Sequence, residues 1–196
     1  MAGVGTSIAG AGLGFLAPGL SIVGMIGGFI GVIALAFMDP TNVTRRQNVF
    51  LGITALLGLG IAPLLMGSSL GAVIAATVGT AGIFGGFTLA ALKSKRKSML
   101  QLGGVLMGGL FVLVGVSLAG LLLPLLGVTN PAVLAALHSF NLYAGLGIFS
   151  LFVAYDTQRM IEDYHDGNRD HVGPALSMFL NIFNIFIRLL AIFRGD

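Results

Sequence analysis

Long uncharged runs, separated by short charged stretches, organise this chain. Residues 1–38, 47–92 and 98–155 contain no Asp, Glu, Lys or Arg. A helix needs about 20 apolar residues to cross a bilayer, so these runs are long enough to hold more than one crossing each. The runs are continuously apolar and do not alternate apolar with polar positions, which favours membrane helices over a β-barrel.

Glycine, proline and small polar residues subdivide the runs into apolar segments. The predicted segments are 3–16, 20–38, 48–66, 70–92, 99–123, 132–154 and 175–193. Asn130 followed by Pro131 is a typical helix start, with a capping residue and then proline in the first turn. The pattern predicts one all-α domain over residues 1–196, a polytopic bundle of six to seven transmembrane helices. Within it, residues 1–17 form a short or truncated first helix.

Composition and charge placement strengthen the membrane assignment. Hydrophobic residues make up 56% of the chain and charged residues 9%, whereas soluble domains carry about a quarter charged residues. The charges gather at "RR" (45–46), at "KSKRK" from Lys93 to Lys97, and in an acidic stretch at 155–171, which fall on one side if the segments alternate. Lys and Arg in short loops mark the cytoplasmic or matrix side. The chain has no cysteine, which excludes disulfides and thiolate metal sites.

Two further features suggest partners. The basic run from Lys93 to Lys97 is a topology determinant that could also bind anionic lipid, and we expect no nucleic acid binding. Small residues four apart let helices approach closely, either within the bundle or against other membrane subunits, and we favour packing within the chain. The glycine pairs that carry this prediction are Gly24 and Gly28, Gly82 and Gly86, and Gly104 and Gly108.

Few ionisable groups lie in or beside the apolar segments, and such groups are functional candidates by default. Asp156 follows the sixth segment, and Arg159 one turn later could form a local salt bridge with it. Asn181, Asn184 and Arg188 share one helix face and should point into the bundle, towards Asp156. Two interpretations stay open. Arg188 and Asp156 neutralise each other in a structural latch, or Asp156 and the asparagine side-chain oxygens form an oxygen site suited to Ca²⁺.

No catalytic constellation is present in the sequence, so we predict no enzyme and no cofactor other than possible Ca²⁺. His138 has no acidic residue on a plausible shared face. The stretch "DYHDGNRD" (163–170) lacks the alternating acids and the final glutamate of a calcium-binding loop, and we interpret it as a solvated acidic loop.

The C-terminal third carries a family resemblance. "LFVAYDTQRMIEDY", with its D-T-Q-x-x-I pattern, and "ALSMFLNIFNIFIRLLAIF" resemble the transmembrane Bax inhibitor motif family. The "NIFIR" form is most similar to the mitochondrial branch, the growth-hormone-inducible transmembrane proteins. The resemblance implies seven helices, with the last helix central and surrounded by the other six. It also implies a mitochondrial inner-membrane location with the charged loops on the matrix side.

The resemblance also implies an activity. In that family an aspartate pair on the sixth and seventh helices acts as a proton- and calcium-sensitive latch. Asp156 matches the first aspartate, whereas Asn181 stands where the second is expected. An amide cannot titrate, so the like-charge repulsion of such a pair is lost, but a permanent hydrogen bond to Asp156 can form. The predicted function is a calcium leak or calcium–proton exchange with an altered latch. The alternative is a non-transporting structural or assembly subunit of a larger mitochondrial inner-membrane complex.

Overall fold

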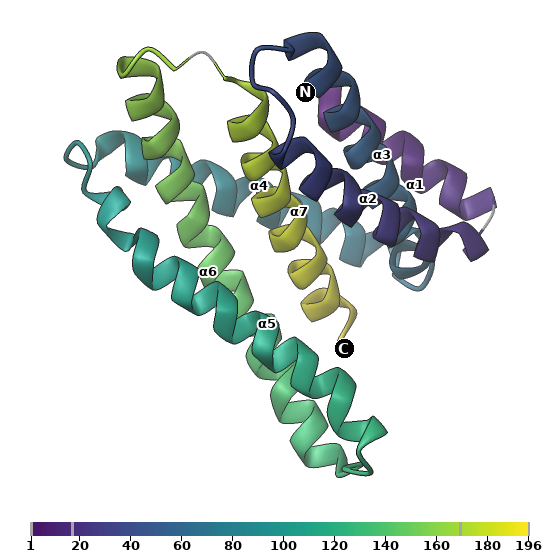
Figure 1. Cartoon of the computed structure of the whole chain (residues 1–196). Helices are drawn as coiled ribbons and strands as arrows, with labels where there is room; N and C mark the ends of the chain where they lie inside the picture. The colour runs from purple at the N-terminus through teal and green to yellow at the C-terminus, as the bar shows by residue number, and fades with distance from the viewer. Residues whose placement is uncertain (1, 17, 169, 196) are drawn as a thin grey trace. The chain divides into compact units, whose positions relative to one another are not determined.

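The computed structural model describes residues 2–16, 18–168 and 170–195, and every regular element in these ranges is helical (Figure 1). The helices are α1 (Ala2–Leu16), α2 (Ser21–Ala36), α3 (Val43–Met66), α4 (Leu70–Lys93), α5 (Gly103–Leu125), α6 (Pro131–His165) and α7 (Val172–Arg194). Two short 3₁₀ turns, η1 (Pro18–Leu20) and η2 (Met99–Leu102), precede α2 and α5. The predicted all-α class is confirmed. Residues 1 and 17 of the predicted first segment, and residue 169 of the predicted acidic loop, lie outside the described residues.

In the described part of the chain, five helical stretches are long and apolar enough to cross a membrane: α3, α4, α6, α7 and the continuous stretch of η2 and α5 (Met99–Leu125). The shorter helices α1 and α2 have 15 and 16 residues, below the usual length of about 20 for a crossing. Large apolar side chains are exposed along these helices, for example Phe29 on α2 and Phe111 on α5, as expected of surfaces that face lipid. The prediction of a polytopic helical membrane bundle is confirmed.

Helix α6 differs most from its prediction. We expected a segment that ends at 154 and a loop from 155, but the helix continues to His165. No glycine or proline interrupts residues 155–165, and the helix ends only before Gly167, whose φ of 80° suits a residue without a Cβ. The start agrees with the prediction: Pro131 occupies the first turn, and the Asn130 side chain accepts a hydrogen bond of 3.0 Å from the Ala132 N–H.

The chain divides into two compact units, of which the first comprises residues 1–73 and 168–179. In this unit α1 and α2 both pack along α3. Glycine makes this approach possible, because a Cβ added at Gly24 would lie 2.6 Å from the Leu56 carbonyl oxygen. One added at Gly28 would lie 2.7 Å from the Leu57 side chain. Ile53 on α3 is fully enclosed at this contact.

The second unit comprises residues 74–167 and 180–196. Here α5 runs beside α6, teal beside green in Figure 1. Among its described residues, the largest fully buried apolar side chains are Leu106, Val153, Ile185 and Leu190. Helix α7 contributes residues to both units, and the single domain predicted from the sequence stays a prediction.

Four glycines do not behave as predicted. No described atom lies within 4 Å of a Cβ added at any of the following positions: Gly82, Gly86, Gly104 and Gly108. The close helix packing predicted for these two pairs is therefore not seen within the described part of the chain. All four glycines are exposed among the described residues, which agrees with the open space beside them.

Candidate functional site

Asp156 and Asn181 face each other inside the second unit. Asn181 Nδ2 on α7 donates a hydrogen bond of 2.6 Å to Asp156 Oδ2 on α6. Asp156 is 8% exposed and Asn181 5%, so the contact is shielded from solvent. A buried carboxylate needs such partners, because transfer of an unpaired charge out of water is costly. The structure thus brings the predicted acid against the predicted face of the last helix.

The other two members of the predicted stripe lie elsewhere. Asn184 Nδ2 donates 3.0 Å to the Leu180 carbonyl oxygen of its own helix. Arg188 Nη1 donates 3.2 Å to Asn141 Oδ1 on α6. Arg188 lies seven residues beyond Asn181, about 10 Å further along α7, and it makes no ion pair with Asp156. The predicted neutralisation of Asp156 by Arg188 is therefore wrong for this structure.

The local salt bridge considered between Asp156 and Arg159 is also absent among the described contacts. Arg159 Nε lies 3.9 Å from Asp163 Oδ2, one helical turn further on. Arg159 is exposed and Asp163 is partly exposed, so this long ion pair contributes little to stability.

Gln158 on α6 forms hydrogen bonds with the end of α4 and with the loop that follows it. Its Nε2 donates to the carbonyl oxygens of Ala91 and Lys95, each at 3.1 Å, and its Oε1 accepts 2.8 Å from the Met99 N–H. The side chain is buried, and its amide satisfies backbone groups at the end of α4 and the start of η2. This role of Gln158 is not predicted by the D-T-Q pattern. The sequence carries no signal for it, because the partners of the side chain are backbone groups of a distant loop.

Glu162 binds the basic run. Its two oxygens accept from Arg96 Nε at 2.6 Å and from Arg96 Nη2 at 2.9 Å, and Lys97 Nζ lies 3.3 Å away. The hydrogen bond and the charge of Glu162 raise the pKa of Arg96 above its ordinary value. Two cations of the run are thus already paired within the chain, although both side chains remain more than half exposed. Any binding of anionic lipid there stays a prediction.

A second charged contact belongs to the first unit. Arg46 Nη1 lies 2.8 Å from Asp170 Oδ1, and Arg46 is 5% exposed. The charges at 45–46 do not lie in a loop, because both arginines belong to α3. In the stretch predicted to be a solvated acidic loop, residues 164–168 are exposed, but the Asp170 side chain is only 20% exposed. Asp170 also accepts from the N–H groups of Val172 and Gly173, at 3.0 and 3.2 Å, and so caps the start of α7.

The electrostatics of Asp170 follow from these contacts. Burial raises its pKa, but the hydrogen bonds from Arg46, Gly173 and Val172 outweigh burial and hold the pKa below its ordinary value of 3.8. No group of three or more His, Cys, Asp or Glu that could hold a metal ion occurs among the described residues. A Ca²⁺ ion at Asp156 would therefore need amide, backbone or water oxygens for its remaining ligands.

Together these observations define an integral membrane protein built from apolar helices, with a buried acid–amide contact between its last two helices. The whole chain, residues 1–196, matches the protein family described as "Inhibitor of apoptosis-promoting Bax1", and the chain belongs to this Bax inhibitor family. The family resemblance predicted from the D-T-Q and N-I-F motifs is thereby confirmed. The finer prediction of the growth-hormone-inducible branch stays a prediction.

Similar proteins come from plants and animals. The chain is 34% identical over 186 residues to "Bax inhibitor 1" of Oryza sativa subsp. japonica, which covers 91% of this chain and 71% of that protein. It is 33% identical over 171 residues to "Probable Bax inhibitor 1" of Paralichthys olivaceus, covering 84% and 68%. It is 32% identical over 176 residues to "Bax inhibitor 1" of Bos taurus, covering 88% and 70%. No solved structure matches the chain.

Proposed function

We propose that this protein is a calcium leak or calcium–proton exchanger of the Bax inhibitor type, in which Asp156 controls passage and Asn181 holds it closed. The observation that carries the proposal is the buried hydrogen bond of 2.6 Å between these two side chains. It joins α6 to α7 through the only two side chains that the family resemblance assigns to the latch. Opening would require this contact to break or to be replaced.

Calcium offers a replacement for that hydrogen bond. Ca²⁺ prefers carboxylate and carboxamide oxygens, and an asparagine carries a donor and an acceptor on the same planar group. A half-turn of the Asn181 amide would present its oxygen, in place of its N–H, to a cation held by Asp156. Two protein oxygens leave four or more Ca²⁺ positions to water or backbone. Such a site binds Ca²⁺ weakly, which is expected of a protein that lets the ion pass and does not retain it.

Proton coupling should be weak in this protein. Two adjacent carboxylates resist ionising together and share a proton, which couples such a pair to pH. Asn181 cannot contribute a proton at any relevant pH. We therefore expect a flux that changes little with pH in the natural chain, and a stronger pH response once a second acid is restored.

Flux through proteoliposomes tests the proposal. Purified protein is reconstituted with a calcium-sensitive dye inside, and flux is recorded before and after a pH step. We expect Asp156→Asn to abolish the flux, and Asn181→Asp to raise it severalfold and make it respond to pH. The matched control is Asn184→Asp, which adds the same charge one turn away, at a residue bonded to its own helix. Natural-chain flux equal to that of empty liposomes, with no increase in Asn181→Asp, would rule out transport.

Location is part of the same proposal. The "NIFIR" resemblance favours the mitochondrial inner membrane, with the loops around Arg45 and Lys93 to Lys97 on the matrix side. Fractionation of cells that express the tagged protein tests the organelle. Recovery of the protein in another membrane would reject the mitochondrial assignment without affecting the flux result.

A structural or assembly subunit is the second candidate, and one observation favours it. The glycine pairs Gly82 with Gly86 and Gly104 with Gly108 have open space beside them in the described structure. Small residues four apart would accept a closely packed helix from another subunit. Purification in mild detergent should then recover a stoichiometric partner. Gly86→Leu should release this partner, whereas Ala81→Leu, on another face of α4, should retain it. A partner-free monomer would contradict this alternative.

A further inference from the structure

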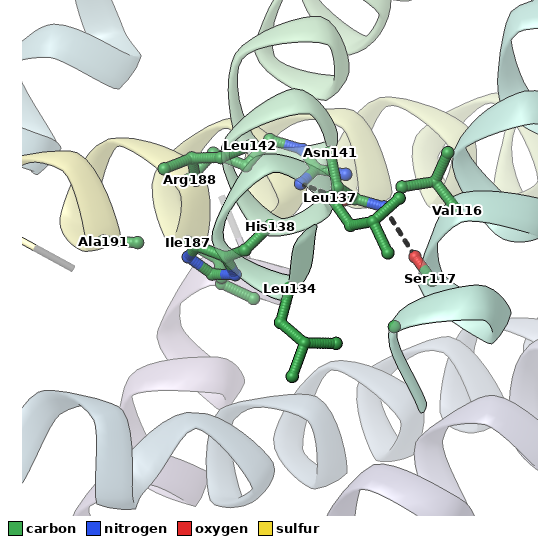
Figure 2. Close-up of a pocket in the computed structure, with 11 residues that line it drawn as sticks. Val116, Ser117, Leu134, Leu137, His138, Asn141, Leu142, Ile187, Arg188 and Ala191 are labelled. Atoms are coloured by element: carbon green, nitrogen blue, oxygen red, sulfur yellow. Dashed lines mark hydrogen bonds between the residues drawn. The ribbon is translucent and has the colours of Figure 1, made fainter. Parts of the chain in front are cut away.

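A cavity of about 420 Å³ lies between α5, α6 and α7, within the second unit (Figure 2). Its walls are mostly Leu, Ile, Val and Ala side chains. Its polar lining consists of Ser117 on α5, His138 and Asn141 on α6, and Arg188 on α7. This volume falls in the usual range for small-molecule sites, which combine apolar walls with a few polar groups.

Arg188 is held firmly at the cavity. Its Nη1 donates 3.2 Å to Asn141 Oδ1, and its guanidinium carbon lies 5.2 Å from the centre of the Phe149 ring, a cation–π distance. Glycine at position 145 leaves the room for this group, since a Cβ there would overlap the guanidinium. Asn141 is itself fixed, because its Nδ2 donates to Ser117 Oγ at 2.6 Å and to the Leu113 carbonyl oxygen at 3.0 Å. Figure 2 shows this chain from Arg188 through Asn141 to Ser117.

The positive charge of Arg188 has no counter-ion in the described part of the chain. None of the ion pairs there includes Arg188, and its Nε is buried without a hydrogen-bond acceptor. Arginine stays charged in proteins, and a cation within a membrane span is costly unless an anion accompanies it. Arg188 lies six residues before the end of α7, about 9 Å along the axis, and so inside the spanning segment. The compensating anion must come from outside these residues.

We infer that the cavity binds an anionic amphiphile, with a carboxylate or phosphate head group on Arg188 and an apolar chain along the Leu and Ile walls. An oxyanion would satisfy the unused Arg188 donors, with His138 as a further donor nearby. The apolar walls favour an amphiphile over a free inorganic anion. Ser117 and His138 are both exposed, so the cavity is open towards the surroundings of the helices. The inference does not depend on calcium transport.

Tryptophan fluorescence provides the test, because the natural chain contains no tryptophan. Phe149→Trp places one reporter beside Arg188, and the full chain in detergent micelles is titrated with dibromostearate, whose bromines quench a neighbouring indole. We expect dibromostearate to quench at a concentration about tenfold lower than its uncharged methyl ester, since the charge-assisted hydrogen bonds require the anion. Brominated phosphatidate is titrated in parallel. Quenching by it alone identifies a phospholipid head group, and quenching by dibromostearate alone identifies a fatty acid.

Three further variants, each on the Phe149→Trp background, make the test specific. Arg188→Gln should remove the preference for dibromostearate over its methyl ester. Arg159→Gln, which replaces an exposed arginine near the other end of α6, should keep that preference. Leu134→Phe should block the cavity with Arg188 intact, and it tests the inference even if Arg188→Gln fails to fold. Equal quenching by dibromostearate and its methyl ester would overturn the inference. So would a preference for dibromostearate that persists in Arg188→Gln or in Leu134→Phe. Displacement of dibromostearate by an equal concentration of inorganic phosphate would overturn it too, in favour of a free-anion site.

Discussion

Three polar residues near the C-terminal end of α6 contact different neighbours because of their spacing. Gln158 and Glu162 are four residues apart and share a face, which holds the loop after α4 through Met99 and Arg96. Asp156 lies two residues before Gln158, on nearly the opposite face, and contacts α7. The Asp156 contact and the loop contacts therefore lie on different faces of α6.

The contacts of Asp170 predict how the stability of the folded protein changes at acidic pH. Its pKa is lowered in the folded protein, so its contacts stabilise the fold fully above its ordinary pKa of 3.8, and this contribution is lost as the pH falls below that value. Asp170→Asn should cost about 1–3 kcal/mol at pH 7, as expected for hydrogen bonds to a charged group. The difference from the natural chain should shrink as the pH is lowered towards 3. Thermal unfolding of both proteins in detergent, followed by circular dichroism across this range, measures it.

The control for that experiment is Asp163→Asn. Asp163 meets Arg159 at 3.9 Å on an accessible helix face, where ion pairs are worth little. We expect its unfolding midpoint to match that of the natural chain at every pH. A difference for Asp170→Asn that stayed constant down to pH 3 would show that the ionised carboxylate is not what stabilises the start of α7.

At the scale of elements, glycine position decides how closely two helices approach. A Cβ added at Gly10 on α1 would overlap the Ala55 carbonyl oxygen on α3, and one at Gly58 on α3 would overlap the Ser7 carbonyl oxygen on α1. Each glycine therefore accommodates backbone of the other helix. A hydrogen bond of 2.5 Å between the hydroxyls of Thr6 and Thr54 lies in the same contact. Such close packing, with a polar pair inside it, is typical of membrane helices.

Gly10 and Gly12 offer a matched pair for testing this contact. Gly10→Ala should destabilise the protein by about 1–3 kcal/mol, because the methyl group must push α1 away from α3. Gly12→Ala changes the same helix at a position with no described atom within 4 Å of the new Cβ. It should be neutral or slightly stabilising, since alanine is the better helix former. Unfolding midpoints in detergent compare the two, and equal midpoints would mean that α1 and α3 do not depend on this approach.

At the scale of the whole molecule, sequence predicted elements better than contacts. The uncharged runs predicted the helices, and the scarcity of polar groups in the last two segments left Asp156 and Asn181 as natural partners. The contacts of Gln158 were not predictable, because they bind backbone groups whose position depends on the fold. Arg46 was misassigned because its neighbour Arg45 suggested an exposed loop, while its partner Asp170 lies far along the chain.

Membrane topology is the remaining expectation at this scale, and four spanning helices carry it. If α3, α4, α5 and α6 each cross the bilayer, the loops before and after each helix lie on opposite sides. Arginine and lysine in short loops then place the loops around residues 41, 98 and 168 on the inner side. The loops around residues 67 and 129, which carry no charge, lie on the outer side. This arrangement does not depend on the shorter helices α1 and α2.

The absence of cysteine makes the arrangement directly measurable, since each new cysteine is a unique thiol. Thr41→Cys, Ser98→Cys and Asn168→Cys should react with a membrane-impermeant maleimide from one side only. Gly67→Cys and Thr129→Cys should react only from the other side, and detergent should make all five reactive. Labelling of Thr41→Cys and Gly67→Cys from the same side would mean that α3 does not cross.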